Sequence, residues 1–324
     1  MRLRQLILMI SLGASIAGCA SHAQREYDQQ AAPDFLFRPR TALACGDRVP
    51  GQLPEQKLPP GTRSFAVVSP AQASWMRTRL ETLTFPRAQL PALTVASSEG
   101  NLIDIAGSGR ADWSLNFCAR GEGDTDAQAR GYLQSISLAR EGGLVTLDGP
   151  GRSGRTGAWG TLSVDAPADA PIMIHDSFGA VQIQNMAGPV WVSSAHARAT
   201  ILNTTGRVDV TGSVVDFAGL RGTVMLNAAD EIDLKLTGKQ FVGSVYAGAQ
   251  RSVRVLLQRD FQTPFQAVVS RRKDFVCRAE LCSKIQSRKD GGWYTFTYSG
   301  DGSAPPARVS FQSEHATVVI DTWD

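Results

Sequence analysis

Apolar and polar residues alternate in a repeating pattern through the middle of the chain, from Ile172 to Leu234. Gly188, Gly206, Gly222 and Gly238 follow one another at intervals of 18, 16 and 16 residues. A triplet with apolar outer residues follows each of the first three glycines: Val190-Trp191-Val192, Val208-Asp209-Val210 and Val224-Met225-Leu226. A short, near-constant period with strand-like alternation is typical of a β-solenoid, in which each repeat forms one rung.

A second triplet lies about half a period away from the first. Its copies are Val181-Gln182-Ile183, Ala199-Thr200-Ile201, Val215-Asp216-Phe217 and Ile232-Asp233-Leu234. Because successive side chains of a strand point to opposite faces, the outer residues should face the core and the middle residues should face away from it. We therefore expect one set of residues to be buried and three aspartates to be exposed: Val190, Val208, Val224, Ile201, Phe217 and Leu234 against Asp209, Asp216 and Asp233.

Other elements flank these rungs, which we expect at about 159–257. Ser69-Pro70-Ala71-Gln72 has the form of a helix-capping box, and apolar residues at helical spacing follow it, so a short helix is expected at about 70–83. A second capping box at Thr125 predicts a helix through Leu133. Glu141-Gly142-Gly143 lies between two strand-like runs and predicts a hairpin. The expected fold is therefore all-β, a single β-solenoid with an N-terminal tether and one or two short helices.

The N-terminus has the form of an export signal. Arg2 and Arg4 precede an apolar run, Leu6 to Ile16, that is too short to span a bilayer. The run ends in Ile16-Ala17-Gly18-Cys19, which resembles the bacterial lipobox. The resemblance implies that Cys19 carries the lipid anchor, and Ala20 favours the outer membrane by the family's sorting rule. The alternative is an ordinary secretory peptide cut near Ala20 or Ala23.

These signals divide the chain into three parts. We expect residues 1–18 to be a lipoprotein signal peptide and residues 19–62 to hold the lipidated cysteine, a polar tether and a proline-rich linker. Residues 63–324 should then form the β-solenoid domain. More than one acyl chain at Cys19 would make membrane anchoring stable.

Four cysteines follow Cys19, an even number in an oxidising compartment. Cys277 and Cys282 close a small local loop, and their pairing leaves Cys45 with Cys118. A metal site is the weaker interpretation, because the local pair has C-x4-C spacing and no histidine nearby. We expect no bound metal and no cofactor.

Charge excludes one class of partner. Removing Arg2 and Arg4 from the 33 Lys and Arg residues leaves 31 against 30 Asp and Glu, a net charge of +1. Nucleic-acid binding needs a concentrated basic face, so it is not expected.

Two candidate surfaces point to other partners. Trp191 is an aromatic residue in an outward position, where a protein partner is a natural occupant. Arg271, Arg272 and Lys273 belong to a basic run that would suit lipopolysaccharide or anionic headgroups. An envelope glycan is a third partner class. A charge run is more often a solvated face, and the alternative for Trp191 is burial under a loop or the N-terminal region.

Asp216 and Asp233 are the one pair that suggests catalysis. Neighbouring rungs would place them about 5 Å apart, the separation used by retaining glycosidases. The simpler interpretation is two solvated carboxylates on a strand surface. No G-x-S-x-G motif occurs, so a serine nucleophile has no support.

A family resemblance rests on three stretches: Asp112 to Arg120 (DWSLNFCAR), Asp126 to Arg130 (DAQAR) and Leu162 to Ala168 (LSVDAPA). With the glycine-punctuated rungs, they resemble the bacterial putative-adhesin β-solenoid family of exported lipoproteins. The resemblance covers about residues 90–324 and implies surface display without catalytic residues. We therefore expect a lipid-anchored envelope or surface protein with a non-catalytic role. The alternatives are a carbohydrate-active β-helix enzyme and a periplasmic scaffold or sensor that binds an envelope protein.

Overall fold

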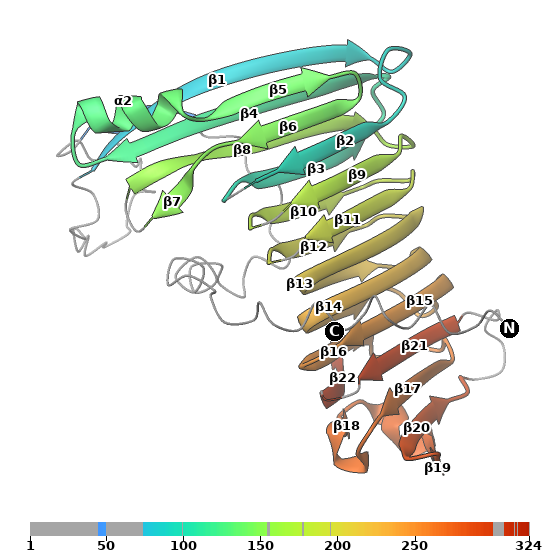
Figure 1. Cartoon of the computed structure of the whole chain (residues 1–324). Helices are drawn as coiled ribbons and strands as arrows, with labels where there is room; N and C mark the ends of the chain where they lie inside the picture. The colour runs from blue at the N-terminus through green and yellow to red at the C-terminus, as the bar shows by residue number, and fades with distance from the viewer. Residues whose placement is uncertain are drawn as a thin grey trace, which may run out of the picture. The chain divides into compact units, whose positions relative to one another are not determined.

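A computed structural model describes residues 45–49, 74–98, 100–153, 156–176, 178–194, 196–300, 308–313, 315 and 317–323. The chain divides into two units, Met1–Thr41 and Ala42–Asp324, and every described residue belongs to the second. The described part is mostly β, with strands joined into one sheet and one α-helix (Figure 1), so the expected all-β class is confirmed. No described helix has the length and apolar character needed to cross a membrane.

The strands form two series of hydrogen-bonded neighbours. In the first series most pairs are parallel, and antiparallel pairs occur at its two ends. In order of pairing, its members are β5 (Ser137–Glu141), β6 (Leu144–Asp148), β2 (Leu93–Ser97), β9 (Ile172–Asp176), β11 (Val190–Ser194), β13 (Arg207–Gly219), β14 (Arg221–Leu236), β15 (Val242–Ala249), β21 (Arg308–Ser313), β17 (Phe265–Val269), β20 (Trp293–Tyr298) and β19 (Gln286–Asp290).

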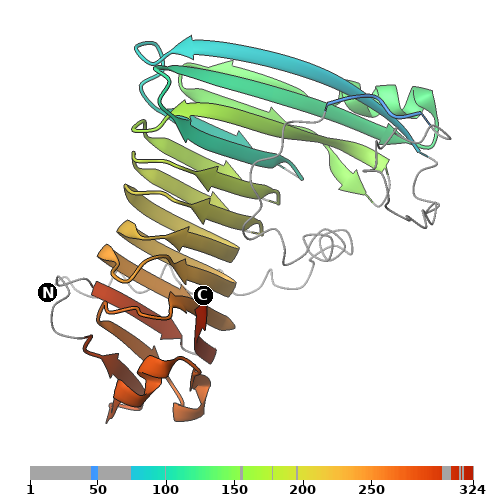
Figure 2. The same ribbon diagram turned by 180° about the vertical axis from the view of Figure 1, so that it is seen from behind.

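The second series contains the same two long strands, β13 and β14, which pair with the first series through their first halves and with the second through their second halves. Its order is β1 (Trp75–Pro86), β4 (Asp112–Gly123), β8 (Thr156–Pro167), β3 (Leu102–Ser108), β10 (Ala180–Gln184), β12 (Arg198–Leu202), β13, β14, β16 (Ser252–Gln258), β22 (Thr317–Trp323) and β18 (Phe275–Cys277). The short β7 (Gly151–Ser153) pairs with β8. Seen from behind in Figure 2, the strands from β9 to β16 follow one another in steps.

The pairing registers repeat the spacing of the glycines. Met173 pairs with Trp191, Trp191 with Asp209, and Asp209 with Met225, at intervals of 18, 18 and 16 residues. Met225 then pairs with Tyr246, 21 residues later. The regular period therefore ends after β14.

Backbone crowding explains why glycine recurs. A Cβ at Gly206 would lie 2.4 Å from the carbonyl oxygen of Ala187, so a side chain cannot fit there. Gly222, which has φ +131°, pairs with Gly243, whose Cβ would lie 2.1 Å from the carbonyl oxygen of Gly222. Gly238 has no such close neighbour. Gly243 therefore takes the place beside Gly222 that the repeat assigns to Gly238, because the turn before β15 is five residues longer than the repeat predicts.

The apolar core contains the residues that the triplets assign to it. Val190, Val208, Val224, Ile201, Phe217 and Leu234 are all buried, which confirms the expected inward set. Tight interior packing means that each contributes through transfer from water and through the void its loss would leave.

Two local predictions are confirmed and one is wrong. The helix α2 (Asp126–Gln134) starts at Thr125, whose hydroxyl accepts from the Gln128 backbone N–H at 3.2 Å. The hairpin β5–β6 turns at Gly142, which has φ +55°.

The helix expected at about 70–83 is not formed by the described residues, because β1 begins at Trp75 and pairs along its whole length with β4. From Arg79 to Pro86 its side chains alternate between half-buried and exposed, and this strand period overrides the helical spacing of Met76, Leu80 and Leu83. The capping box at residues 69–72 lies outside the described residues.

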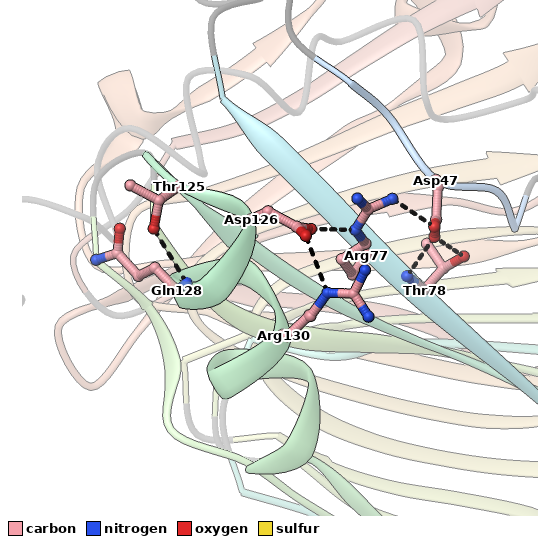
Figure 3. A network of polar contacts seen from close by, with 7 residues as sticks. All are labelled: Asp47, Arg77, Thr78, Thr125, Asp126, Gln128 and Arg130. Atoms are coloured by element: carbon pink, nitrogen blue, oxygen red, sulfur yellow. Dashed lines mark hydrogen bonds and ion pairs between the residues drawn. The ribbon is translucent and has the colours of Figure 1, made fainter.

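Residues 45–49 are fixed to β1 and β4 by a group of contacts that we call the N-terminal clamp, and Figure 3 shows the part of it around Asp47 and Arg77. Cys45 forms a disulfide with Cys118, and Arg48 makes a two-hydrogen-bond bridge with Met76. Asp47 accepts from the guanidinium of Arg77 at 2.9 Å, and Arg77 also donates to Asp126 at 2.5 Å. The clamp therefore joins residues 45–49 directly to β1 and β4, and Arg77 of β1 links it to the helix.

Candidate functional site

One middle residue per strand forms a column across the first series, which we call the Trp191 column. Its members are Met173 on β9, Trp191 on β11, Asp209 on β13 and Met225 on β14. The methionines are 39% and 46% exposed, whereas Trp191 and Asp209 are half-buried. The sequence predicted that Trp191 points outward, and the structure places it in a face that carries apolar side chains towards solvent.

A row of short polar side chains lies beside this column, two residues further along the same strands. Its members are His175, Ser193, Thr211 and Asn227. They line a hollow of about 250 Å³ together with the Trp191 column. The sequence interpretation missed this row, although the same register that aligns Trp191 with Asp209 also aligns Ser193 with Thr211.

A second hollow, of about 470 Å³, extends the first towards β2 and β6. His175 and Ser193 line both hollows, so the two form one groove across neighbouring strands. The described residues that line it include the carboxylates Asp148, Asp176 and Asp209 but neither lysine nor arginine. Asp209 accepts from Arg207 at 2.8 Å. The groove is therefore neutral to acidic.

The Trp191 column continues to a second aromatic residue. Tyr246 on β15 pairs with Met225. A Cβ at Gly248 would lie 3.0 Å from the Tyr246 hydroxyl and 3.3 Å from its ring, so the ring lies over this glycine. The glycine thus gives the ring room to lie close to the strand, and Trp191 and Tyr246 provide two aromatic surfaces on one face.

The corresponding middle residues of the second series, which we call the Asp216 column, behave in the opposite way. Gln182, Thr200 and Asp216 are buried, and Asp233 is mostly buried. The expectation of three exposed aspartates is therefore wrong for Asp216, whose exposed fraction is 0%, and the side chains of Asp233 and Asp209 are only 16% and 22% exposed. Arg198 on β12 donates two hydrogen bonds to its carboxylate, at 2.5 and 3.0 Å, and Thr200 donates a third at 3.2 Å. These partners offset part of the cost of burying the charge.

Asp233 has an arginine of its own. Arg254 on β16 donates to both oxygens of this carboxylate, at 2.7 and 2.8 Å. The register does place Asp216 beside Asp233, as expected. Burial raises the pKa of Asp216 above its ordinary value, while Arg198 opposes that rise. Two carboxylates that are each held by a guanidinium are poorly placed to attack or protonate a substrate, because the arginine already engages both oxygens of each carboxylate.

The basic residues predicted from the sequence lie between β17 and β18, around the 3₁₀ helix η3 (Arg272–Asp274). Arg271, Arg272 and Lys273 are exposed, and Arg271 donates to Asp274 at 2.7 Å. The second 3₁₀ helix, η4 (Glu280–Lys284), follows, and the disulfide between Cys277 and Cys282 joins it to β18. Both cysteine pairings expected from the sequence are therefore present.

Two further observations concern histidine and metal binding. His196 stacks on Phe178 with ring centroids 5.0 Å apart. The part of the chain that the structure describes holds no group of three or more His, Cys, Asp or Glu residues suited to a metal. Cys19, the candidate for lipidation, lies outside the described residues.

Comparison with known proteins finds likeness only among solved structures. No family model matches the chain, and no curated protein matches it. A putative adhesin from Bacteroides fragilis is 10% identical, with a TM-score of 0.36, over 76% of this chain and 97% of that one. A putative cell adhesion protein from Clostridium sporogenes is 9% identical, with a TM-score of 0.31, over 76% and 100%. Likeness at this level leaves the function to be argued from the chain's own residues.

Proposed function

We propose that this protein is a lipid-anchored envelope protein of the outer membrane that binds a partner without catalysing a reaction. In this proposal the parallel strand series form a β-solenoid within residues 63–324, and the chain between the lipid at Cys19 and the clamp at Cys45 tethers it. The observation that carries the binding role is the Trp191 column, which presents apolar and aromatic side chains to solvent beside a groove. Large exposed apolar groups cost solubility, and they commonly mark interaction sites.

The alternative of a carbohydrate-active enzyme has less support. Its candidate residues, Asp216 and Asp233, lie in the Asp216 column, where each accepts two hydrogen bonds from an arginine. A glycosidase needs one carboxylic acid able to release a proton and one carboxylate able to reach the sugar. A structural role for both residues fits this geometry better.

A scaffold or sensor that binds an envelope protein is the second candidate for the same face. Tryptophan and methionine are enriched at protein interfaces, and Met173, Trp191 and Met225 lie on consecutive paired strands.

The lipid anchor is tested in cells grown with labelled palmitate. Wild-type protein should incorporate the label and fractionate with the outer membrane, while Cys19→Ala should carry no label and leave that fraction. Ala20→Asp is the matched variant: it should keep the label but move to the inner membrane. Absence of label from the wild-type protein would refute the anchor.

A further inference from the structure

We infer that the groove beside the Trp191 column binds a linear, uncharged glycan chain that lies across the strands. This inference rests on the proposed binding function and names the ligand class for it. The groove runs from Asp148 on β6 to Asn227 on β14, over consecutive neighbours of the first series.

The backbone under the groove favours recognition by side chains. Strands β9, β11 and β13 each pair with a neighbour on both sides within this series. An extended peptide gains much of its affinity by adding a strand to a free sheet edge, and these central strands offer none. A ligand that crosses them must be held by the side chains that project from the face.

The spacing of those side chains suits a repeating polymer. Adjacent strands lie about 4.8 Å apart, so the Trp191 column presents one side chain at each such step. One sugar ring with its linking oxygen advances an extended polysaccharide by a similar distance. From β9 to β15 there are four steps, or about 19 Å, which a chain of a few sugars would span.

The chemistry on each side of the groove also fits a sugar. A pyranose ring has a face of C–H groups and a rim of hydroxyls. Trp191 and the methionines offer flat or flexible apolar contacts for the face. Ser193, Thr211 and Asn227 offer donors and acceptors for the rim, and Asp209 offers an acceptor.

Charge limits which glycans fit. The described lining contains no lysine or arginine, and its ionisable groups other than His175 are carboxylates. The nearby Arg207 is already engaged by Asp209. Phosphorylated and uronate-rich chains would meet repulsion without a compensating cation. Neutral sugars would not.

The inference is tested by electrophoresis of the purified protein through native gels that hold xylan, mannan, mixed-linkage glucan, glycol chitin or polygalacturonate. At least one uncharged polysaccharide should retard the wild-type protein, and polygalacturonate should not. Titration calorimetry with oligosaccharides of the retarding polymer should show a hexasaccharide binding more tightly than a disaccharide. Trp191→Ala should weaken that binding by about tenfold or more, the usual effect of removing a central aromatic anchor.

Trp293→Ala is the matched control, because Trp293 is a half-buried tryptophan on β20, outside the groove lining. It should leave binding unchanged. The inference is overturned if no uncharged polysaccharide retards the protein, if only polygalacturonate does, or if Trp191→Ala binds as well as Trp293→Ala. In those cases a photo-crosslinker at residue 193 tests the proposed binding function independently of the glycan. Capture of a discrete envelope protein in cells would keep the binding role while rejecting the glycan.

Discussion

The Trp191 column and the Asp216 column arise from the same sequence pattern and have opposite environments. Both consist of middle residues flanked by buried apolar neighbours. In the first series the middle residues include a tryptophan and two methionines, and the methionines are open to solvent. In the second series they are polar, yet Gln182, Thr200 and Asp216 are buried. The alternation of a strand fixes which residues face the core, but it does not fix whether the other face is open.

The partners of the middle residues show what separates the two columns. Arg198 lies two residues before Thr200 on β12, and from there it reaches the Asp216 carboxylate on the next strand. In the Trp191 column the corresponding arginine, Arg207, pairs with Asp209 of its own strand and both side chains keep contact with solvent. A buried carboxylate therefore depends on its partner, whereas an exposed one does not. Substitutions in the two columns should therefore change the free energy of unfolding by different amounts.

The largest effects should come from the core that both columns share. Phe217→Ala removes a buried ring from the second series and should lower the free energy of unfolding by about 3–5 kcal/mol through lost transfer energy and a cavity. Met225→Ala, at an exposed position, should change it by about 1 kcal/mol or less. Urea denaturation of both variants gives the comparison, and equal losses would contradict the assigned faces.

A comparable loss should follow from breaking the buried ion pair. Asp216→Ala leaves Arg198 without its carboxylate and should cost about 3–5 kcal/mol. Asp209→Ala, in the exposed column, should cost about 1 kcal/mol or less.

A double substitution separates pairing from simple loss of contact. The variant Arg198→Met with Asp216→Leu replaces both charges by apolar groups and should recover most of the stability that Asp216→Ala loses. If the double variant is less stable than Asp216→Ala in the same urea titration, the ion pair is not the reason for the loss.

Much of this architecture could be predicted from the sequence, and the failures have local causes. The inward residues, α2, the hairpin and both disulfides follow from periodicity, capping and cysteine spacing. The strand β1 was mistaken for a helix because Met76, Leu80 and Leu83 happen to fit a helical face, and its partner β4 lies more than 25 residues away. The groove was missed because it depends on six strands, β6, β2, β9, β11, β13 and β14, being in register, which no single segment reveals.

A smaller effect is expected in how the free energy of unfolding depends on pH. Because burial raises the folded-state pKa of Asp216, its contribution to stability is fully present below the unfolded value of about 3.9 and is lost as pH rises through the folded value. Asp126 in the N-terminal clamp is the opposite case, since the hydrogen bond from Arg77 lowers its pKa. Its contribution is present above about 3.9 and is lost as pH falls through the folded value.

Denaturant titrations at a series of pH values should therefore show opposite slopes. The stability of the wild-type protein relative to Asp216→Asn should fall with rising pH from about 4 upward. Relative to Asp126→Asn, it should rise over the acidic range. Slopes of the same sign would show that burial does not control Asp216.

The disulfide between Cys45 and Cys118 limits the length of chain between the proposed lipid anchor at Cys19 and the folded domain. If lipid is attached at Cys19, 26 residues separate the membrane from the fixed point at Cys45, and a fully extended chain of that length reaches about 90 Å at most. Were the disulfide reduced and the clamp released, the fixed point would move to β1, which starts 30 residues later, and the maximum reach would roughly double. If the proposed lipid anchor at Cys19 is present, the clamp as a whole, disulfide and polar contacts together, therefore sets how far the folded domain can extend from the membrane.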